Sequence, residues 1–188
     1  MNILETSRLI LRTWREADLD PMSLIDQDKK VCQFLPGIGN RSATKAGIER
    51  IIAHYKEKGF SLYAVELKNT GEMIGFLGLM TPSFEAHFTP AVEIGWRLSS
   101  THWNQGYATE GAKAVLHYAF TSLNLPEVVS FTAVNNLASK RVMEKIGLQH
   151  NPKDDFDHPK LEQNSPLKRH VLYRLSRADY LKNKSIQE

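Results

Sequence analysis

The chain has 188 residues, 41% of them hydrophobic and 24% charged, which suits one globular domain with a single core. Its formal net charge is +3, but the basic residues are scattered among acidic ones, which argues against nucleic acid as the main partner. The single cysteine, Cys32, excludes an intrachain disulfide, and no leader or membrane-length apolar run is visible, so we expect a cytoplasmic protein without a membrane partner.

The first sixty residues predict one strand and two helices. Residues Ile3 to Arg12 alternate apolar and polar side chains, which is typical of a strand. Apolar residues recur at helical spacing from Trp14 to Asp28 and from Thr44 to Lys58. The segment between these helices, Phe34 to Gly39, is punctuated by proline and glycine and predicts a loop.

The next segment predicts a hairpin and a further strand. Residues Phe60 to Leu67 and Glu72 to Met80 have strand character, and the residues between them, Lys68 to Gly71, form a turn signal. A fourth strand is expected from Ala91 to Leu98.

A glycine turn and a helix start follow the fourth strand, with the sequence THWNQGYATEG over residues 101–111. The first turn of a helix leaves several backbone N–H groups without intrahelical partners, and the macrodipole adds positive charge there. A pyrophosphate can therefore bind at such a turn without any basic side chain, and Gly106 would let the backbone approach it. Glycine before a helix is also ordinary turn chemistry, so this turn alone does not decide the function.

The helix behind this turn and the strands around it indicate how the sheet is connected. One apolar stripe runs along the helix, formed by Ala112, Val115, Leu116, Ala119 and Phe120. Strands are expected at Val128 to Val134 and Val171 to Leu175. A helix between two strands of one sheet implies a right-handed crossover and a parallel pair within an otherwise antiparallel sheet. The polar stretch Asn151 to Gln163 predicts a loop, and residues 183–188 predict a frayed tail.

A second motif lies downstream, with the sequence NNLASKRVMEKIGL over residues 135–148. It contains a polar N-cap, a short amphipathic helix and a glycine stop before the next strand. Two such helices behind adjacent strands indicate one ligand cleft.

Together these motifs resemble the GNAT superfamily of acetyl-CoA-dependent N-acetyltransferases, over nearly the whole chain. Residues Asn104 to Ala108 are similar to the family's pyrophosphate loop, and Asn136 to Ser139 to its Asn-x-x-Ser motif. The opening Arg8 to Arg12, followed by Trp14 and Asp18, resembles the branch of ribosomal-protein N-terminal acetyltransferases. One departure is Trp103, where many members begin the loop with Arg or Gln.

The resemblance implies an α+β fold with a mixed, mostly antiparallel central sheet and helices on both faces. Acetyl-CoA would lie in a cleft at the parallel pair of strands 91–98 and 128–134, and the helices at 14–28 and 44–58 would cover the acceptor side. We expect a single domain over residues 1–182, a monomer or homodimer, and no metal. The expected cofactor-binding residues are Ile94, Gly95, Trp96, Gln105, Gly106, Tyr107, Ala108, Thr109, Asn136 and Ser139.

Acetyl transfer to an amine needs a base, and Glu93 is the first candidate. Because side chains alternate along a strand, Glu93, Gly95 and Arg97 share one face of the fourth strand. Partial burial would raise the pKa of Glu93 toward neutrality, as a general base requires. The alternative is a structural salt bridge between Glu93 and a nearby arginine.

The departing thiolate needs a proton or a hydrogen bond, and two residues are candidates to supply it. Ser139 lies one turn into the second helix, although it could also be a plain exposed serine. Many family members use a tyrosine just after this helix, but residues 148–151 contain none. Ser139 is therefore the first candidate and Tyr173 the second.

Four residues are expected on the acceptor side: Phe34, Asp157, His158 and His170. With an unperturbed pKa of about 6.5, either histidine could act as a base or orient a carboxylate near pH 7. A histidine hydrogen-bonded at a strand edge is an equally good interpretation of each. A zinc site is not expected, because neither has a Cys or His partner at ligand spacing.

The sequence thus predicts an N-acetyltransferase that moves an acetyl group to a primary amine of a small molecule or peptide. Direct transfer is expected, because Cys32 lies far along the chain from the cofactor motifs. Dinucleotide-binding, P-loop and Gly-x-Ser-x-Gly signatures are absent from the sequence. Two alternatives stay open: N-terminal acetylation of ribosomal or other proteins, and a non-catalytic acyl-CoA-binding sensor.

Overall fold

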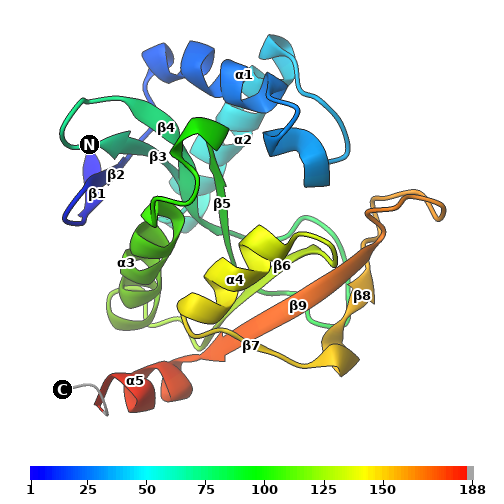
Figure 1. The fold of residues 1–188 in the computed structure, drawn as a ribbon. Coiled ribbons are helices and arrows are strands. Elements are labelled where there is room, and N and C mark those ends of the chain that lie inside the picture. The colour runs from blue at the N-terminus through cyan, green and yellow to red at the C-terminus, as the bar shows by residue number, and fades with distance from the viewer. Residues whose placement is uncertain (186–188) are drawn as a thin grey trace. The chain divides into compact units, whose positions relative to one another are not determined.

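The computed structural model describes residues 1–185, which form two compact units (Figure 1). The first unit holds residues 1–80 and 95–114, and the second holds residues 81–94 and those from 115 onward. The chain passes between the units after Met80, within strand β5 (Glu93–Leu98) and within helix α3 (Tyr107–Thr121). Each unit has a hydrophobic cluster of its own, around Met22 and Ala64 in the first and around Phe88 and Leu172 in the second.

Four strands of the first unit pair antiparallel in chain order: β1 (Asn2–Glu5), β2 (Leu9–Arg12), β3 (Leu62–Leu67) and β4 (Met73–Met80). The hairpin of β3 and β4 confirms the sequence prediction. The prediction of one strand from Ile3 to Arg12 is wrong, because the chain turns back at Thr6, whose N–H bonds the carbonyl of Leu9. The polar residues Thr6, Ser7 and Arg8 separate the two strands in the sequence, and the prediction of a single strand did not take this break into account.

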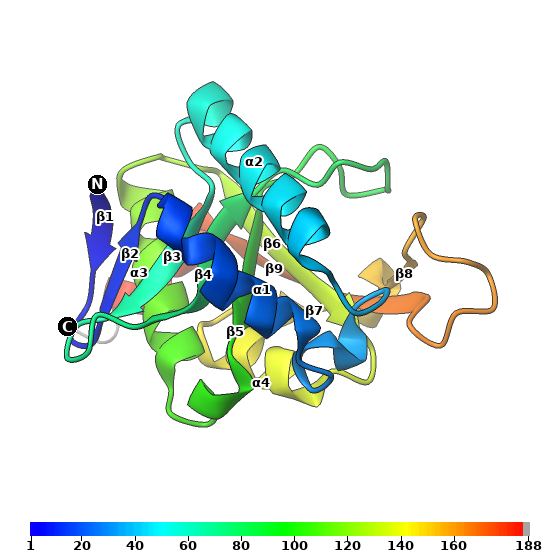
Figure 2. The same ribbon diagram turned by 90° about the horizontal axis from the view of Figure 1, so that it is seen from above.

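Two helices of the first unit, α1 (Leu19–Gln27) and α2 (Arg41–Lys58), pack side by side (Figure 2). Short 3₁₀ turns precede each of them, η1 (Glu16–Asp18) and η2 (Val31–Phe34). Helix α2 begins at the N-cap Asn40, whose side chain accepts from the N–H of Ala43, and ends at Gly59 with φ +78°. Both predicted helices are present with shifted starts, and a 3₁₀ turn occupies the first residue of the predicted loop.

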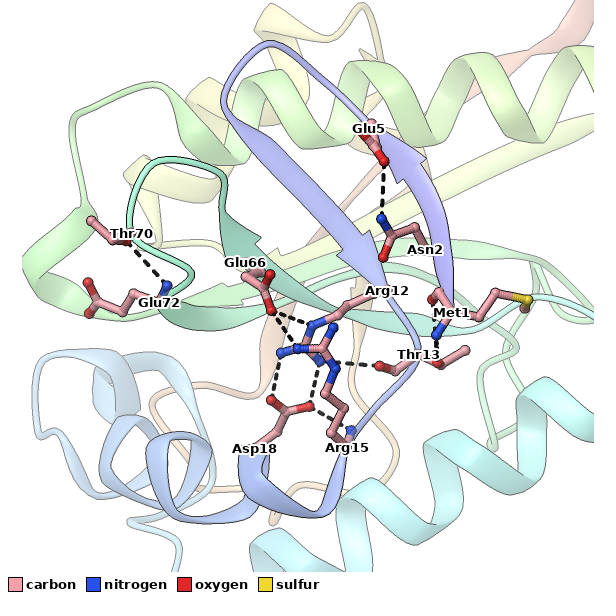
Figure 3. Close-up of polar contacts among 10 residues, drawn as sticks. All are labelled: Met1, Asn2, Glu5, Arg12, Thr13, Arg15, Asp18, Glu66, Thr70 and Glu72. Atoms are coloured by element: carbon pink, nitrogen blue, oxygen red, sulfur yellow. Dashed lines mark hydrogen bonds and ion pairs between the residues drawn. The ribbon is translucent and has the colours of Figure 1, made fainter.

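A buried ion cluster fixes η1 and α1 to the strands (Figure 3). The guanidinium of Arg12, 2% exposed, bonds both carboxylate oxygens of Asp18 at 2.7 and 2.8 Å and Glu66 at 2.7 Å. The hydrogen bond to Asp18 raises the pKa of Arg12 above its ordinary value. Since each buried charge has a partner, the cluster avoids the large cost of an unpaired one.

The second unit is built on β6 (Glu127–Ala133) and β9 (Arg169–Ser176), which pair antiparallel (Figure 1). Short strands β7 (Gln149–His150) and β8 (Phe156–Asp157) also pair with β9. Glu93 of β5 pairs in parallel with Val129 of β6. The sheet is therefore mixed and mostly antiparallel with a parallel β5–β6 pair, which confirms the predicted fold class.

The remaining helices are α4 (Leu137–Lys145), α5 (Arg177–Ser185), η3 (Ser100–His102) and η4 (Pro152–Asp154). The predicted apolar stripe of α3 is fully buried. The predicted loop Asn151 to Gln163 contains η4 and β8, and α5 was not predicted. Of the predicted tail, Asn183 to Ser185 belong to α5, and residues 186–188 lie outside the described residues.

No helix within residues 1–185 combines the length and the hydrophobicity that crossing a membrane requires. Over the same range, no three His, Cys, Asp or Glu side chains gather as they would around a metal ion.

Candidate active site

The glycine turn of the first unit leaves the start of α3 open. After η3 the backbone adopts positive φ at Asn104 (60°) and Gly106 (83°), and the N–H of Glu110 bonds the carbonyl of Gly106 at 2.9 Å. The N–H groups of Tyr107, Ala108 and Thr109 have no hydrogen-bond acceptor among residues 1–185. Three free donors at the positive end of a helix can bind an anion.

Sequence reasoning missed Arg8, which lies at this turn. Its Nη1 donates to the carbonyl of Gln105 at 2.9 Å, and its guanidinium lies 4.4 Å from the centre of the Tyr107 ring. A Cβ added at Gly106 would come within 3.3 Å of Arg8 Nη2. The turn therefore has a neighbouring cation from the β1–β2 hairpin, although residue 103 is not an arginine.

Glu110 connects that hairpin to α3. Its carboxylate accepts from the hydroxyl of Thr6, from the backbone N–H of Arg8 at 2.9 Å and from Arg8 Nε at 2.6 Å. Burial raises the pKa of Glu110, but the hydrogen bonds from Thr6 and Arg8 outweigh burial and hold the pKa below its ordinary value. Glu110 is therefore ionised at neutral pH and fixes Arg8 beside the turn.

Trp103 has a structural contact in this turn. Its indole Nε1 donates to the carbonyl of Leu98 at 2.9 Å, while the side chain remains 40% exposed. The only side-chain donor of Trp103 is thus used to close the turn, and a basic contact comes from Arg8 instead.

The first unit also contains a cavity of about 340 Å³, whose walls come from α1, α2, the segment between them and strands β3 to β5. Arg97 reaches it from β5 and pairs with Asp26 of α1 at 2.6 Å. Phe34, expected on the acceptor side, does not line this cavity; its neighbours Leu35 and Pro36 do. The expected place of Phe34 on the acceptor side therefore stays a prediction.

Glu93, the expected base, lies on β5 in the second unit and is half-buried. Its carboxylate forms no hydrogen bond and no ion pair with any part of residues 1–185, so the salt bridge considered from the sequence is not formed there. Burial without a compensating partner raises the pKa of Glu93 to about 8. The next residue, Ile94, offers its carbonyl to the hydroxyl of Ser130 at 2.8 Å.

The start of α4 is closed by Asn136. Its Oδ1 accepts from the N–H of Ser139 at 3.2 Å, and its Nδ2 donates to the Thr132 hydroxyl at 3.0 Å. Asn136 is therefore a helix N-cap with both ends of its amide used. The hydroxyl of Ser139 is half-buried and makes no hydrogen bond within the described chain, so it is available to a ligand.

Tyr173, the second candidate acid, is buried on β9. Its hydroxyl donates to Glu144 Oε1 of α4 at 3.0 Å, and its ring stacks on His150 with centres 4.9 Å apart. Burial, followed by the hydrogen bond to Glu144, raises the pKa of Tyr173 to about 12. A proton donor already bonded to a carboxylate is poorly suited to protonate a thiolate.

The two candidate histidines of the second unit lie together, with ring centres 5.0 Å apart, among Phe84, Phe131 and Phe156. Burial lowers the pKa of His170 to about 4 and also lowers the pKa of His158. The aromatic surroundings disfavour the charged form of both rings, and for His170 this argues against titration near pH 7. A role for either histidine on the acceptor side stays a prediction. Asp157 pairs with exposed Arg169 at 3.3 Å.

Residues 8–149 match the Acetyltransferase (GNAT) domain. The chain belongs to this family. It is 30% identical over 150 residues to the N-acetyltransferase YoaA of Bacillus subtilis (strain 168), an alignment that covers 78% of this chain and 82% of YoaA. Its structure resembles the acetyltransferase of Agrobacterium tumefaciens str. C58, with 29% identity, a TM-score of 0.74 and 92% of each chain covered. The protein is thus an acetyl-CoA-dependent GNAT acetyltransferase.

The GNAT fold is shared with enzymes of different acceptors. The spermidine N-acetyltransferase of Vibrio cholerae, solved with CoA and spermine, has a TM-score of 0.72 and 18% identity, and the match covers 94% of this chain and 99% of that one. At this identity the likeness shows the fold alone. The ribosomal-protein branch suggested by residues 8–18 is therefore one of several branches with this fold.

Proposed function

We propose that this GNAT enzyme moves the acetyl group of acetyl-CoA directly to a primary amine of a small molecule or peptide, with Glu93 as the base. The observation that carries the proposal is the Glu93 carboxylate, which has no protein partner among residues 1–185 and a pKa raised to about 8. A general base with a pKa near the working pH is the most efficient, because it is available as a base and still accepts a proton readily.

The open start of α3 supports a binding site for the pyrophosphate of acetyl-CoA at this end of the helix. The free N–H groups of residues 107–109 supply donors, and Gly106 has no side chain to block their approach. Arg8, fixed by Glu110, adds a positive charge beside the turn. We propose Gln105 and these residues as the pyrophosphate site, with Ile94, Gly95, Trp96 and Ser139 as further cofactor contacts. Asn136, expected from the sequence to bind the cofactor, would act there through the start of α4 that it caps, because both ends of its amide already have partners.

The proposed reaction uses the two side chains without protein partners in the described chain, Glu93 and Ser139. Glu93 accepts a proton from the acceptor ammonium, directly or through a water, and the freed amine attacks the thioester carbon. Backbone N–H groups near Ile94 and Trp96 stabilise the oxyanion that forms with the new C–N bond. The C–S bond then breaks, the nitrogen loses its remaining extra proton to solvent, and the sulfur leaves as a thiol, with the hydroxyl of Ser139 giving it a hydrogen bond or a proton that solvent replaces.

Direct transfer is favoured over an acyl-enzyme. The thiol of Cys32 is buried and donates to the carbonyl of Asp26 at 3.0 Å, so it is not presented as a nucleophile. The family match spans residues of both units, which supports one acetyltransferase domain.

The test is a screen of amines and N-terminal peptides for CoA release with saturating acetyl-CoA, with the acetylated product identified by mass spectrometry. An acetylated amine formed in a one-to-one ratio with CoA is the expected result. Preference for ribosomal-protein N-terminal peptides would assign the protein to that branch. Tight acetyl-CoA binding without turnover of any acceptor would make it a sensor and overturn the proposal.

A further inference from the structure

The cavity of the first unit has the size and lining of a small-molecule site. Its volume of about 340 Å³ lies at the lower end of the roughly 300–1,000 Å³ found for such pockets. Most of its wall is apolar, including Trp14, Met22 and Phe76. The charged side chains in the wall are Asp26, Arg50 and Arg97.

Both carboxylate oxygens of Asp26 already have partners within the protein. One carboxylate oxygen accepts from Arg97 Nη1 at 2.6 Å, and the other accepts from the hydroxyl of Thr44 at 2.7 Å. The backbone carbonyl of Asp26 accepts from the N–H of Gly39 at 3.0 Å. Asp26 is therefore a buried anchor that fixes Arg97, and it is not a free counter-charge.

Arg97 is held but not saturated. Its bond to Asp26 is the one hydrogen bond that its guanidinium makes within residues 1–185, although the group carries five N–H donors. Its guanidinium also lies 5.2 Å from the centre of the Phe76 ring. The remaining N–H donors of Arg97 are thus available to an acceptor group in the cavity.

The charges of the wall favour an anion. Arg50 is exposed and has no ion pair in the described chain, so the two guanidiniums and the one carboxylate leave a net charge of +1 on the cavity wall. A polyamine would find no free carboxylate here, and Arg97 already occupies the face of Phe76. A carboxylate would gain charge-assisted hydrogen bonds, which are the strong ones in proteins.

We propose that the acceptor is a small amine that carries a carboxylate on an apolar body, as a hydrophobic amino acid does, and that Arg97 and Arg50 bind this carboxylate. The proposal deepens the proposed N-acetyltransferase function and rests on it. Arg97 and Arg50 are then specificity-determining residues, and Asp26 is a positioning residue for Arg97.

The first experiment compares matched acceptors. Leucine, phenylalanine, methionine and tryptophan are tested against their amides and against spermidine, with CoA release measured at saturating acetyl-CoA. Losing the carboxylate should raise KM by about tenfold or more, since charge-assisted bonds are lost. Equal or better turnover of the amides or of spermidine would overturn the proposal.

Equilibrium binding separates this proposal from the proposed function. Calorimetric titration of the same amino acids and amides needs no turnover. Selective binding of the amino acids without acetylation would support the cavity assignment and contradict the enzymatic function. Acetylation of amines without any preference for a carboxylate would support the enzymatic function and contradict the cavity assignment. Absence of selective binding would also overturn the cavity assignment.

Variants locate the carboxylate site. Arg50→Gln removes an exposed charge and should raise KM for the amino acids several-fold while leaving KM for the amides unchanged. Lys56→Gln, on the same helix but outside the cavity wall, is the charge-matched control and should change neither. An Arg50→Gln enzyme that discriminates amino acid from amide as well as the wild type does would remove Arg50 from the assignment.

A test of Arg97 needs a variant that does not leave the carboxylate of Asp26 unpaired. Arg97→Gln alone leaves Asp26 as a buried unpaired charge, so the double variant Arg97→Gln/Asp26→Asn keeps this pair neutral. The preference for the amino acid over its amide should fall at least tenfold, with acetyl-CoA affinity retained. A folded double variant with unchanged preference would contradict the proposal.

Discussion

Helices α3 and α4 begin in opposite ways. At α4 the side chain of Asn136 accepts the N–H of Ser139 at 3.2 Å, so the helix satisfies a donor with its own cap. At α3 the N–H groups of Tyr107, Ala108 and Thr109 find no acceptor within residues 1–185, and Gly106 offers no side chain that could cap them. The capped start of α4 thus has fewer unpaired donors than the open start of α3, which gains hydrogen bonds only when an anion arrives.

The same contrast separates the candidate catalytic groups. Glu93 and the Ser139 hydroxyl have no hydrogen-bond partner in the described chain, while the Tyr173 hydroxyl is bonded to Glu144 at 3.0 Å. Groups left without protein partners are available to substrates, and we expect substitutions there to affect binding or turnover. Substitutions of paired groups should instead affect stability.

The largest effect is expected for Glu93→Gln. The amide cannot accept a proton from the acceptor ammonium, so kcat should fall by about 10²–10⁴-fold while acetyl-CoA binding is retained. Steady-state kinetics with a calorimetric titration of acetyl-CoA check this. Full turnover by the folded variant would remove Glu93 from the mechanism.

Thermal unfolding as a function of pH tests whether Glu93 has a structural partner. Its pKa is about 8 in the folded protein, above the ordinary value of 4.5, so the folded state holds a proton that the unfolded state releases within this window. Protonation of Glu93 therefore contributes to the free energy of unfolding. This contribution is fully present below about pH 4.5 and is lost progressively as the pH rises from there through 8. Glu93→Gln should therefore unfold at a higher temperature than the wild type at pH 9, whereas a structural salt bridge predicts the opposite.

The next effect is expected for Gly106→Val. A branched side chain at φ +83° strains the turn and fills the space where backbone would meet phosphate, so acetyl-CoA affinity should fall at least about tenfold, roughly 1.4 kcal/mol. Gly59→Val, with a similar φ of +78° at the end of α2, is the matched control for strain. It should lose stability and keep its affinity, and equal losses of affinity in both variants would place the cofactor elsewhere.

A smaller effect is expected for Ser139→Ala. A thiol is already a good leaving group, with a pKa of about 8.5 for cysteine as a guide, so kcat should fall about tenfold or less. Tyr173→Phe should leave kcat nearly unchanged, because its hydroxyl is committed to Glu144. Single-turnover rates separate the two, and the reverse pattern would transfer the acid role to Tyr173.

The smallest effect on function is expected at Asn136. Asn136→Ala should lower the free energy of unfolding by about 1 kcal/mol through loss of the cap, with Asn136→Asp as the variant that keeps it. Acetyl-CoA affinity should stay within about twofold in both, far below the 1.4 kcal/mol of a tenfold change. If Asn136→Asp stays as stable as the wild type but binds acetyl-CoA weakly, the side chain contacts the cofactor.

Local features of the fold were predictable from the sequence because neighbouring residues determine them. The apolar stripe of α3, the cap at Asn136 and the hairpin of β3 and β4 all follow from spacing. Helix α5 had a local signal too, since Ser176 caps it by accepting from the N–H of Asp179. That signal was missed because the helix is polar and shows no clear apolar stripe.

The features that define the site depend on contacts distant in sequence. Arg8 and Glu110 pair across 102 residues, and nothing in either segment predicts this partner. The pKa of His170 depends on burial against phenylalanines from two separate segments, Phe131 and Phe156. Spacing along the chain therefore identified candidate residues, but not which of them would be paired and which left free.

Amide hydrogen exchange at residue resolution, followed by NMR with and without acetyl-CoA, tests the contrast between the two helix starts most directly. The N–H groups of Tyr107, Ala108 and Thr109 should exchange quickly in the free protein and be strongly protected once acetyl-CoA binds. The N–H of Ser139, already bonded to Asn136, should be protected in both states. Saturation with acetyl-CoA that leaves exchange at residues 107–109 unchanged would contradict the assignment of the open start of α3 as the cofactor site.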